Sequence, residues 1–259
     1  MRVMSINTNG IRAAARKGFF EWLPKVDPDV VCIQETKAQI DQLSDPIFHP
    51  EGYHCHYHDA EKKGYSGVAI YSKQKPRKVI HGLTHDPAWE EFNREGRVIE
   101  AQFDNLSVLS VYLPSGSSKE ERQLAKFRFM DLFRPYLQSL KRKRREFIIC
   151  GDWNIVHTER DIKNWKSNQK NSGCLPEERA WLTALFDEDG YVDSFRELEQ
   201  EPHTYTWWSN RGQAYANNVG WRLDYQVLSP KLKGTVKRTE VYKDDRFSDH
   251  APFIVDYEL

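Results

Sequence analysis

Short apolar runs of strand length recur along the whole chain, and most of them end in polar residues or glycine. Runs of about four to eight residues rich in Val, Ile, Leu, Phe and Tyr are typical of buried strands. Hairpin-like spacing between neighbouring runs favours a mixed or antiparallel sheet over a purely parallel one. We expect strands at residues 3–7, 30–34, 68–72, 98–103, 106–112, 147–150, 223–228 and 254–257.

Helical periodicity occurs in three segments, at residues 18–26, 119–140 and 177–188. Pro24 is expected to kink or end the first of them. Pro176, followed by two glutamates, is a favourable start for the third. Because strands alternate with helices, we expect an α/β layered fold.

Polar side chains follow the strand predicted at residues 147–150, in the sequence Cys-Gly-Asp-Trp-Asn. In an extended chain, residues two apart point the same way, so Asp152 and Asn154 are expected to face one spot. The first predicted strand ends in a similar way, with Asn7 and Asn9. Two such strand ends favour two sheets that pack as a sandwich and share one site.

Acidic, phenol and imidazole side chains also stand beside other predicted strands, at Glu35, Tyr112, Asp224, Asp249 and His250. A single Asp or Asn at a strand end is usually a turn former, but five strand ends of this kind indicate a shared site. Such a set suits hydrolysis at a phosphate, which uses a hard cation, a base for water and hydrogen-bond donors for the oxyanion.

Composition narrows the class of protein without fixing it. The chain has 259 residues with a formal net charge of +0, which allows one large domain or two small ones. Balanced totals neither favour nor exclude a nucleic-acid partner, because they can hide a basic face. No apolar run approaches the roughly 20 residues of a membrane span, and the first residues have the pattern of a strand rather than a signal peptide. The 4 cysteines lack paired spacing, so we expect reduced thiols in a cytoplasmic protein.

Seven motifs, in order and at family spacings, resemble those of the exonuclease III family of apurinic/apyrimidinic (AP) endonucleases, a branch of the endonuclease/exonuclease/phosphatase superfamily. They are SINTNGIRAA, QETKA, KKGYSGVAIYS, SVYLPSG, GDWNI, GWRLDY and FSDHAP, and the helix start LPEERAWL also matches. The resemblance implies one catalytic domain over residues 1–259 with the fold of a four-layer α/β sandwich. Two mixed β-sheets would pack face to face with helices on the outside, and the site would lie where their strand ends meet.

The resemblance also implies a set of metal-binding residues. Glu35 resembles the principal ligand of Mg²⁺, for which Mn²⁺ can substitute, and Asn7 and Asp249 resemble residues on the metal side of the site. A carboxylate suits Mg²⁺, which keeps several waters and needs few protein ligands. The ordinary alternative for Glu35 is an exposed acid that pairs with Lys37.

For the chemistry itself, Asp152 resembles the group that orients or deprotonates the attacking water. Asn154 and Tyr112 resemble donors to the phosphate oxygens. Asp224 and His250 resemble a pair in which the carboxylate fixes the imidazole and favours its cationic form, which stabilises charge on phosphate. Without the motifs, Tyr112 would be interpreted as a core aromatic whose hydroxyl is satisfied elsewhere, and His250 as an ordinary surface or core histidine.

The tryptophan-rich tract offers a pocket for a base-less sugar, which leaves the DNA helix at little stacking cost. Trp207, Trp221 and Leu223 are the expected walls, whereas Trp208 is expected in the core. The family often has Phe in place of Trp207, and many relatives have Asn or Gln in place of Ser115. Other residues in segments that resemble DNA contacts are Asn9, Lys37, Ser115, Arg211, Arg12, Lys163, Lys166 and Lys170, although a plain turn at Asn9 and solvated surface charge elsewhere are the ordinary alternatives.

Two further patterns are assigned no role in the chemistry. His54, His56 and His58 alternate, as zinc ligands on one strand face would, but alternation is common on edge strands and the motif that follows aligns as scaffold. The basic run at residues 141–145 lies between a predicted helix and a predicted strand. We interpret it as a solvated connection with weak DNA steering.

The resemblance therefore implies a Mg²⁺-dependent AP endonuclease of base excision repair, which hydrolyses the DNA phosphodiester 5′ to an abasic site and leaves a 3′-hydroxyl. Related activities are 3′-phosphodiesterase, 3′-phosphatase and 3′→5′ exonuclease. The partner would be double-stranded DNA with abasic sites or blocked 3′ ends, with no membrane, and the protein would be a cytoplasmic monomer. One alternative is a non-catalytic regulator on the same scaffold, which would have lost the metal and base residues that are present here. Another is a phosphatase acting on phosphoinositide or sphingolipid, against which the GWRLDY motif and the tryptophan-rich tract argue.

Overall fold

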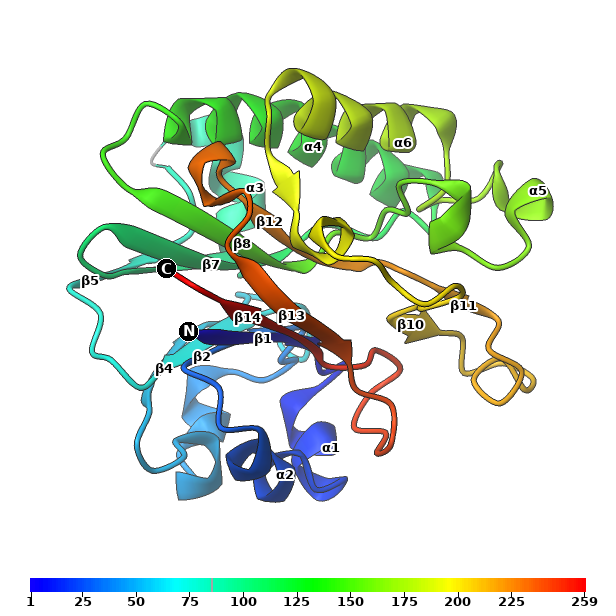
Figure 1. Ribbon diagram of the computed structural model, residues 1–259. Coiled ribbons are helices and arrows are strands. Elements are labelled where there is room, and N and C mark those ends of the chain that lie inside the picture. Colours follow the sequence, from blue (N-terminus) through cyan, green and yellow to red (C-terminus); the bar gives the residue numbers. More distant parts are fainter. Residues whose placement is uncertain (85) are drawn as a thin grey trace.

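The computed structural model describes residues 1–84 and 86–259, and two six-stranded sheets packed face to face form its centre (Figure 1). The first sheet has the spatial order β13 (Val236–Val241), β14 (Phe253–Tyr257), β1 (Arg2–Asn7), β2 (Val30–Gln34), β4 (Val68–Ser72) and β3 (His54–His58). The second has the order β5 (Lys78–His81), β6 (Val98–Gln102), β7 (Leu106–Tyr112), β8 (Glu146–Asp152), β12 (Asp224–Leu228) and β9 (Val192–Asp193). A small third sheet pairs β10 (Trp207–Trp208) with β11 (Gly220–Trp221).

Both large sheets are mixed, as the spacing of the apolar runs predicts. In the first sheet β1 runs parallel to β2 and antiparallel to β14. In the second sheet β7 runs parallel to β8, and β12 is antiparallel to β8. Each sheet therefore brings the carboxyl ends of two parallel central strands to the same edge.

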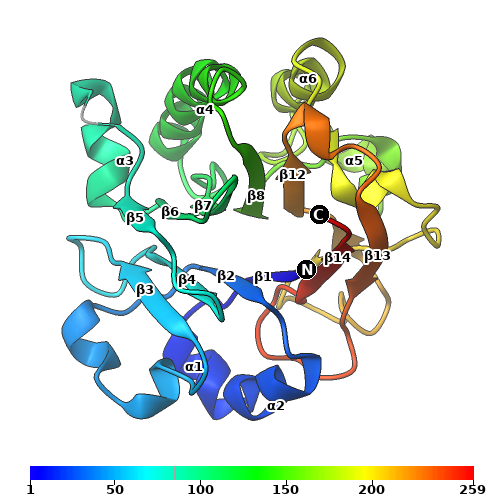
Figure 2. The same ribbon diagram turned by 60° about the vertical axis from the view of Figure 1, so that its left-hand side comes forward.

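The central strands are apolar on both faces, which explains why they appear in the sequence as continuous runs. Val3, Cys32 and Ile148 face the layer between the two sheets. Val31 packs instead against the helices outside the first sheet, and Ile149 packs against those outside the second. The fold thus has four layers, helix–sheet–sheet–helix (Figure 2).

The outer layers contain the helices. On the first sheet lie α1 (Ile11–Arg16) and α2 (Phe19–Val26), and on the second lie α3 (Glu90–Arg94), α4 (Glu120–Leu140) and α6 (Pro176–Thr183). The short α5 (Trp165–Asn168) lies beside the end of the second sheet (Figure 1). Within the described ranges, 1–84 and 86–259, no helix is both long and apolar enough to span a membrane.

The three predicted helices are present with adjusted ends. α2 continues through Pro24 and ends at Val26, before Asp27 adopts a left-handed conformation. The third begins at Pro176 as expected, and residues 184–188 continue it as a π-helical turn. The pattern missed α1, α3 and α5 because they are short. It missed β13 because four of the six residues in its sequence, VKRTEV, are polar or charged, so the strand contains no apolar run.

Neither of the two patterns without an assigned role lies on a central strand. β3, which carries the alternating histidines, is an edge strand, and His58 Nδ1 lies 3.0 Å from the Val98 carbonyl oxygen. The basic run connects α4 to β8. Lys141 Nζ donates to the Asp189 carbonyl oxygen at 2.7 Å, and Arg145 donates to Ser107 Oγ at 3.0 Å. All four cysteines have free thiols.

Candidate active site

A polar cleft of about 710 Å³ opens where the strand ends of the two sheets meet. It brings together most of the residues that the sequence predicts for the site: Asn9, Glu35, Tyr112, Ser115, Asp152, Asn154, Trp207, Arg211, Trp221, Leu223, Asp249 and His250. A larger and more apolar cavity of about 880 Å³ lies at the opposite ends of the strands, near Met1 and Leu106. None of the predicted site residues lines that second cavity, so the chemistry belongs to the cleft.

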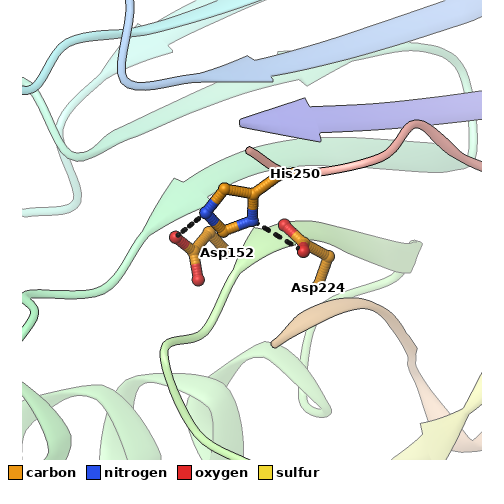
Figure 3. A group of neighbouring side chains, drawn as sticks. All are labelled: Asp152, Asp224 and His250. Atoms are coloured by element: carbon orange, nitrogen blue, oxygen red, sulfur yellow. Dashed lines mark hydrogen bonds and ion pairs between the residues drawn. The ribbon is translucent and has the colours of Figure 1, made fainter. Parts of the chain in front are cut away.

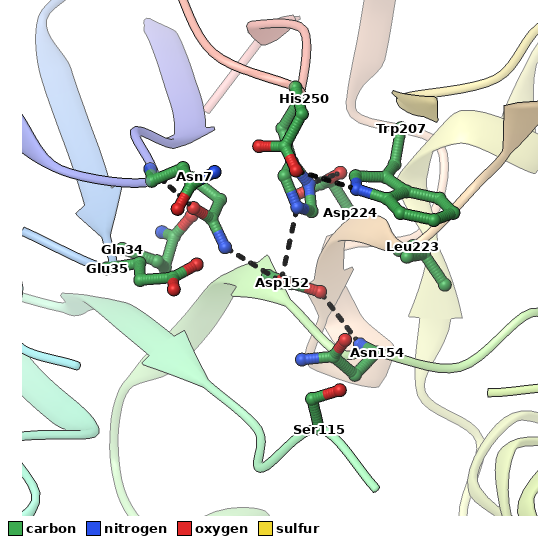
Figure 4. A network of polar contacts seen from close by, with 12 residues as sticks. Asn7, Gln34, Glu35, Ser115, Asp152, Asn154, Trp207, Leu223, Asp224 and His250 are labelled. Atoms are coloured by element: carbon green, nitrogen blue, oxygen red, sulfur yellow. Dashed lines mark hydrogen bonds and ion pairs between the residues drawn. The ribbon is translucent and has the colours of Figure 1, made fainter. Parts of the chain in front are cut away.

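Strand register explains how the polar groups converge. In the second sheet, Asp152 is the register partner of both Tyr112 and Asp224, so three site residues form one row across β7, β8 and β12. In the first sheet, Asn7 is opposite Gln34, and Glu35 follows directly. The two rows face each other across the sandwich (Figure 4).

The similar ends of β1 and β8 make the same turn. Asn7 Oδ1 accepts a hydrogen bond from the Asn9 N–H at 2.8 Å, and Asp152 Oδ1 accepts one from the Asn154 N–H at 2.9 Å. Asn9 and Asn154 both have left-handed backbones, with φ of 45° and 54°. The expectation of an extended chain through Asn154 is therefore wrong, because β8 ends at Asp152 and the side chain of Asp152 closes a turn.

One hydrogen bond joins the two sheets inside the site. Asn7 Nδ2 donates to Asp152 Oδ2 at 2.9 Å (Figure 4), and both side chains are buried. Both ends of the Asn7 amide thus contact protein groups, and the amide orients Asp152. A direct part for Asn7 in metal binding stays a prediction.

His250 lies between two buried carboxylates (Figure 3). Its Nδ1 lies 2.9 Å from Asp224 Oδ2, and its Nε2 lies 3.7 Å from Asp152 Oδ2. Burial acts against a positive charge, but Asp224 and Asp152 outweigh it and raise the pKa of His250 to about 10. The three groups could together hold a metal ion, yet a protonated His250 offsets one of the two negative charges without a metal.

Asp152 has the environment of a base that works near neutral pH. Burial raises the pKa of Asp152 to about 7, and the charge of His250 makes the largest contribution that lowers this pKa. The hydrogen bond from Asn7 also lowers the pKa. A carboxylate of this pKa can accept a proton from water more readily than an ordinary aspartate.

Glu35 and Tyr112 face the cleft from opposite sheets. Glu35 forms an ion pair with Lys37 at 3.1 Å, and the Glu35 side chain is 17% exposed. The pairing with Lys37, which is the ordinary alternative to metal binding for this acid, is therefore also present. Lys37 Nζ also donates to Asn9 Oδ1 at 2.5 Å. Among residues 1–84 and 86–259, no hydrogen-bond partner is found for the Tyr112 hydroxyl, although the ring packs on the Arg97 guanidinium at 5.0 Å. The hydroxyl therefore remains available to a ligand.

The acids around the cleft suit a hard cation. Glu35 and Asp249 supply carboxylate oxygens to the lining, and Asp224 Oδ1 is buried without a hydrogen-bond partner in the described part of the chain. Oxygen donors of this type fit Mg²⁺ or Mn²⁺ better than softer metals. Burial acts to raise the pKa of Asp249, but His250 and the hydrogen bond from Trp207 outweigh it, so the pKa of Asp249 lies below its ordinary value.

An apolar wall borders the acids. Trp207 and Trp221 meet edge to face, with ring centroids 5.8 Å apart, and Leu223 is buried beside them. Trp207 Nε1 donates to Asp249 Oδ2 at 3.0 Å, which ties this wall to the polar side of the cleft. Trp208 is 1% exposed and packs in a separate small core, as predicted.

The basic residues divide into two groups. Arg211 and Lys170 line the cleft. Arg12, Lys163 and Lys166 are exposed outside its lining, and Arg12 donates to the Lys37 carbonyl oxygen at 3.3 Å. These three residues stay predictions as contacts to a longer ligand.

Sequence reasoning missed the buried cations behind the cleft. Arg222 bonds Asp193 at 2.7 Å and supports the segment between Trp221 and Leu223, and Lys126 contacts the loop after β8. A signal existed for Lys126, because it lies on the same helical face as Phe129 and Phe133, where an apolar residue is expected.

The fold and the site define a class of enzyme: α/β sandwiches that carry a hydrolytic centre at the strand ends. The sequence matches the Endonuclease/Exonuclease/phosphatase family over residues 4–250. The chain belongs to this family and, within it, to the exonuclease III family of AP endonucleases.

Similarity extends over nearly the whole chain. An exodeoxyribonuclease of Bacillus subtilis is 41% identical over 254 residues, which cover 97% of each chain. The structure of an AP endonuclease from Archaeoglobus fulgidus superposes with a TM-score of 0.87 at 26% identity, covering 100% of both chains. The structure of a 3′ phosphatase from Neisseria, bound to a product DNA hairpin, also has a TM-score of 0.87, at 25% identity and 100% coverage of both chains.

Proposed function

We propose that this protein is a Mg²⁺-dependent AP endonuclease that hydrolyses the DNA phosphodiester 5′ to an abasic site and leaves a 3′-hydroxyl. The observation that carries the proposal is the position of Asp152, which is fixed by Asn7 and His250 and lies beside the apolar wall of Trp207 and Trp221. Asp152, held in this way, can activate water at a phosphate, and the apolar wall can accept a sugar that lacks its base. Relatives whose names refer to exodeoxyribonuclease, AP endonuclease and 3′ phosphatase activity support the same class of substrate.

In this mechanism Asp152 holds the attacking water and accepts its proton. His250, kept cationic by Asp224, stabilises the charge that develops on the phosphate. The Tyr112 hydroxyl and the Asn154 side chain add neutral hydrogen bonds to the phosphate oxygens. Glu35 and Asp249 would hold Mg²⁺, which supplies positive charge to the phosphate and the leaving oxygen when it is bound.

The wider assignments follow from the same proposal. The substrate is double-stranded DNA with abasic sites or blocked 3′ ends, with Asn9, Lys37, Ser115 and Arg211 as its further contacts. We infer that residues 1–259 form one catalytic domain, because the core between the sheets is continuous, and we propose that this domain works as a monomer. A cytoplasmic location is supported by the four free thiols.

The test is cleavage of a duplex that contains one tetrahydrofuran abasic analogue. We expect a single cut 5′ to the analogue with Mg²⁺, and none after chelation. An intact duplex of the same sequence is the control. If the protein binds the abasic duplex but leaves it uncut at any Mg²⁺ concentration, a non-catalytic regulator is the correct assignment.

Glu35→Gln should lower the cleavage rate at limiting Mg²⁺ by about 100-fold or more, since even groups that only support a metal ligand contribute about 10- to 100-fold. Higher Mg²⁺ or Mn²⁺ should recover part of the loss, because the amide still offers one oxygen. Rates should be measured across a metal titration, with Glu51→Gln, an exposed residue outside the cleft, as the control. A Glu35→Gln enzyme with the wild-type rate at limiting Mg²⁺ would remove Glu35 from the metal site.

Trp221→Ala should lower cleavage at the abasic analogue by at least about tenfold more than it lowers removal of a 3′-phosphate, which corresponds to about 1.4 kcal/mol of selectivity. A terminal phosphate need not place an extrahelical sugar against the wall. The two activities should be compared at one salt concentration, because phosphate contacts make DNA affinity strongly salt-dependent. Equal losses in both activities, with unchanged thermal stability, would assign Trp221 to the core rather than to the pocket.

A further inference from the structure

A buried ion pair lies behind the cleft, between α4 and α6, two of the helices that cover the second sheet. Lys126 Nζ is 2.6 Å from Glu178 Oε1, and the side chains are 1% and 0% exposed. Lys126 comes from α4, and Glu178 comes from the first turn of α6. Removing two charges from water costs about as much as their attraction returns, so an apolar pair would stabilise the fold as well. The contacts of this pair therefore need a further explanation.

The lysine holds the loop that carries Asn154. Its Nζ donates to the Asn154 carbonyl oxygen at 2.7 Å. On the other side of the same residue, the Asn154 N–H is held by Asp152 Oδ1 at 2.9 Å. Because Asn154 lies beyond the end of β8 in a left-handed conformation, no strand pairing fixes its peptide groups. These two hydrogen bonds fix them instead.

The glutamate holds the neighbouring segment that contains Gly173. Glu178 Oε2 accepts hydrogen bonds from the N–H groups of Gly173 at 2.6 Å and Leu175 at 3.1 Å. Gly173 lines the cleft and packs so closely that an added Cβ would lie 3.0 Å from the ring of Trp221 and 3.1 Å from the Asn154 carbonyl oxygen. The ion pair thus joins the loop of Asn154 to the base of the apolar wall, in addition to the backbone hydrogen bond that the Val156 N–H donates to the Gly173 carbonyl oxygen at 2.8 Å.

We propose that Lys126 and Glu178 are positioning residues that fix Asn154 and Gly173 relative to each other, so that phosphate and sugar are held in one geometry. Neither side chain lines the cleft, so the pair acts through Asn154 and Gly173 and touches no substrate. The inference rests on the proposed function for its kinetic readout. Its structural part is independent of that function.

The test uses two double variants, because Lys126→Met alone would leave the buried Glu178 charge unpaired and destabilise the fold. Lys126→Met/Glu178→Gln removes both charges and the donor to Asn154. We expect kcat for the abasic duplex to fall about 10- to 100-fold with KM within twofold of wild type, since a displacement of about 1 Å can cost 100-fold in rate. Lys126→Gln/Glu178→Gln keeps a neutral donor and should recover most of the loss.

The matched control is Arg134→Met. Arg134 lies on the same helix and forms ion pairs with Glu188 and Asp189, which follow α6, but it lies outside the cleft. Its kcat should stay within twofold of wild type. If the Met/Gln variant does not fold, Lys126→Gln/Glu178→Leu replaces it, because this variant removes the contacts to Gly173 and Leu175, and kcat should then fall at least fivefold.

A second readout separates this inference from the proposed function. In ¹⁵N spectra, the amide signals of Asn154 and Gly173 should move in Lys126→Met/Glu178→Gln and stay in place in Arg134→Met. If wild type leaves abasic DNA uncut but these signals move, the function is wrong and the positioning role stands. A folded double variant with kcat within twofold of wild type, or with only KM raised, would overturn the positioning role, as would unmoved Asn154 and Gly173 signals.

Discussion

Asp152→Asn should reduce cleavage of the abasic duplex by about 100- to 10,000-fold, the range by which a positioned general base accelerates a reaction. The amide has nearly the same shape and can still accept the Asn154 N–H, but it cannot take a proton from water. The same substitution should reduce removal of a 3′-phosphate to a similar extent, because both reactions need activated water. Single-turnover rates at saturating Mg²⁺ measure both effects without a contribution from product release.

Asp256→Asn is the matched control for this substitution. Asp256 lies on β14, pairs with Arg2 at 2.7 Å and is remote from the cleft lining, so its loss should change stability slightly and the rate little. An Asp152→Asn enzyme that keeps more than about a tenth of the wild-type rate would show that another group activates the water.

His250→Asn should lower the rate by about 100- to 1,000-fold, the usual cost of removing one group that stabilises the charge of a transition state. Asp224→Asn should produce a smaller loss of the same kind, because Asp224 acts by holding the imidazole at 2.9 Å and keeping it protonated. Once the imidazole is absent, the carboxylate has nothing to orient. The double variant should therefore be little slower than His250→Asn alone.

The rates of wild type, Asp224→Asn, His250→Asn and the double variant should be compared together with their thermal unfolding. The unfolding measurement is needed because His250→Asn leaves Asp224 and Asp152 as neighbouring buried acids, which destabilises the fold. His49→Asn, in an exposed histidine outside the cleft, controls for the substitution itself. Losses that add fully in the double variant would show that the two residues act separately.

The sequence predicts the layers well where a strand is buried on both faces. Residues 30–34 and 68–72 were predicted with their true ends, because Val, Ile and Tyr occupy inward and outward positions alike. Edge strands such as β13 expose one face, so they contain Lys, Arg and Glu and produce no apolar run. Site residues were found because polar groups at the ends of buried strands stand out, while the roles of Glu35 and His250 depended on the family resemblance.

Other parts of the site could not be predicted from the pattern. The left-handed turn at Asn154 depends on a hydrogen bond from its own N–H to the side chain of Asp152, and strand periodicity does not encode such bonds. The pair of Lys126 and Glu178 joins segments far apart in the sequence. The position of Lys126 on the apolar face of α4 signals that it is buried, but only the packing of α4 on α6 shows that Glu178 is buried as its partner.

The site combines a residue from the end of β1 with residues that precede β14, and this arrangement has a consequence for biosynthesis. β1 carries Asn7 and lies between β2 and β14, and β14 follows His250 directly in the sequence. While the ribosome is still making the polypeptide, Asn7 and Glu35 are therefore synthesised well before the strand β14 and the imidazole of His250 that complete the site. A nascent or prematurely terminated product that lacks residues 249–257 would not contain the assembled centre. Nuclease activity would thus arise only after translation has passed this segment.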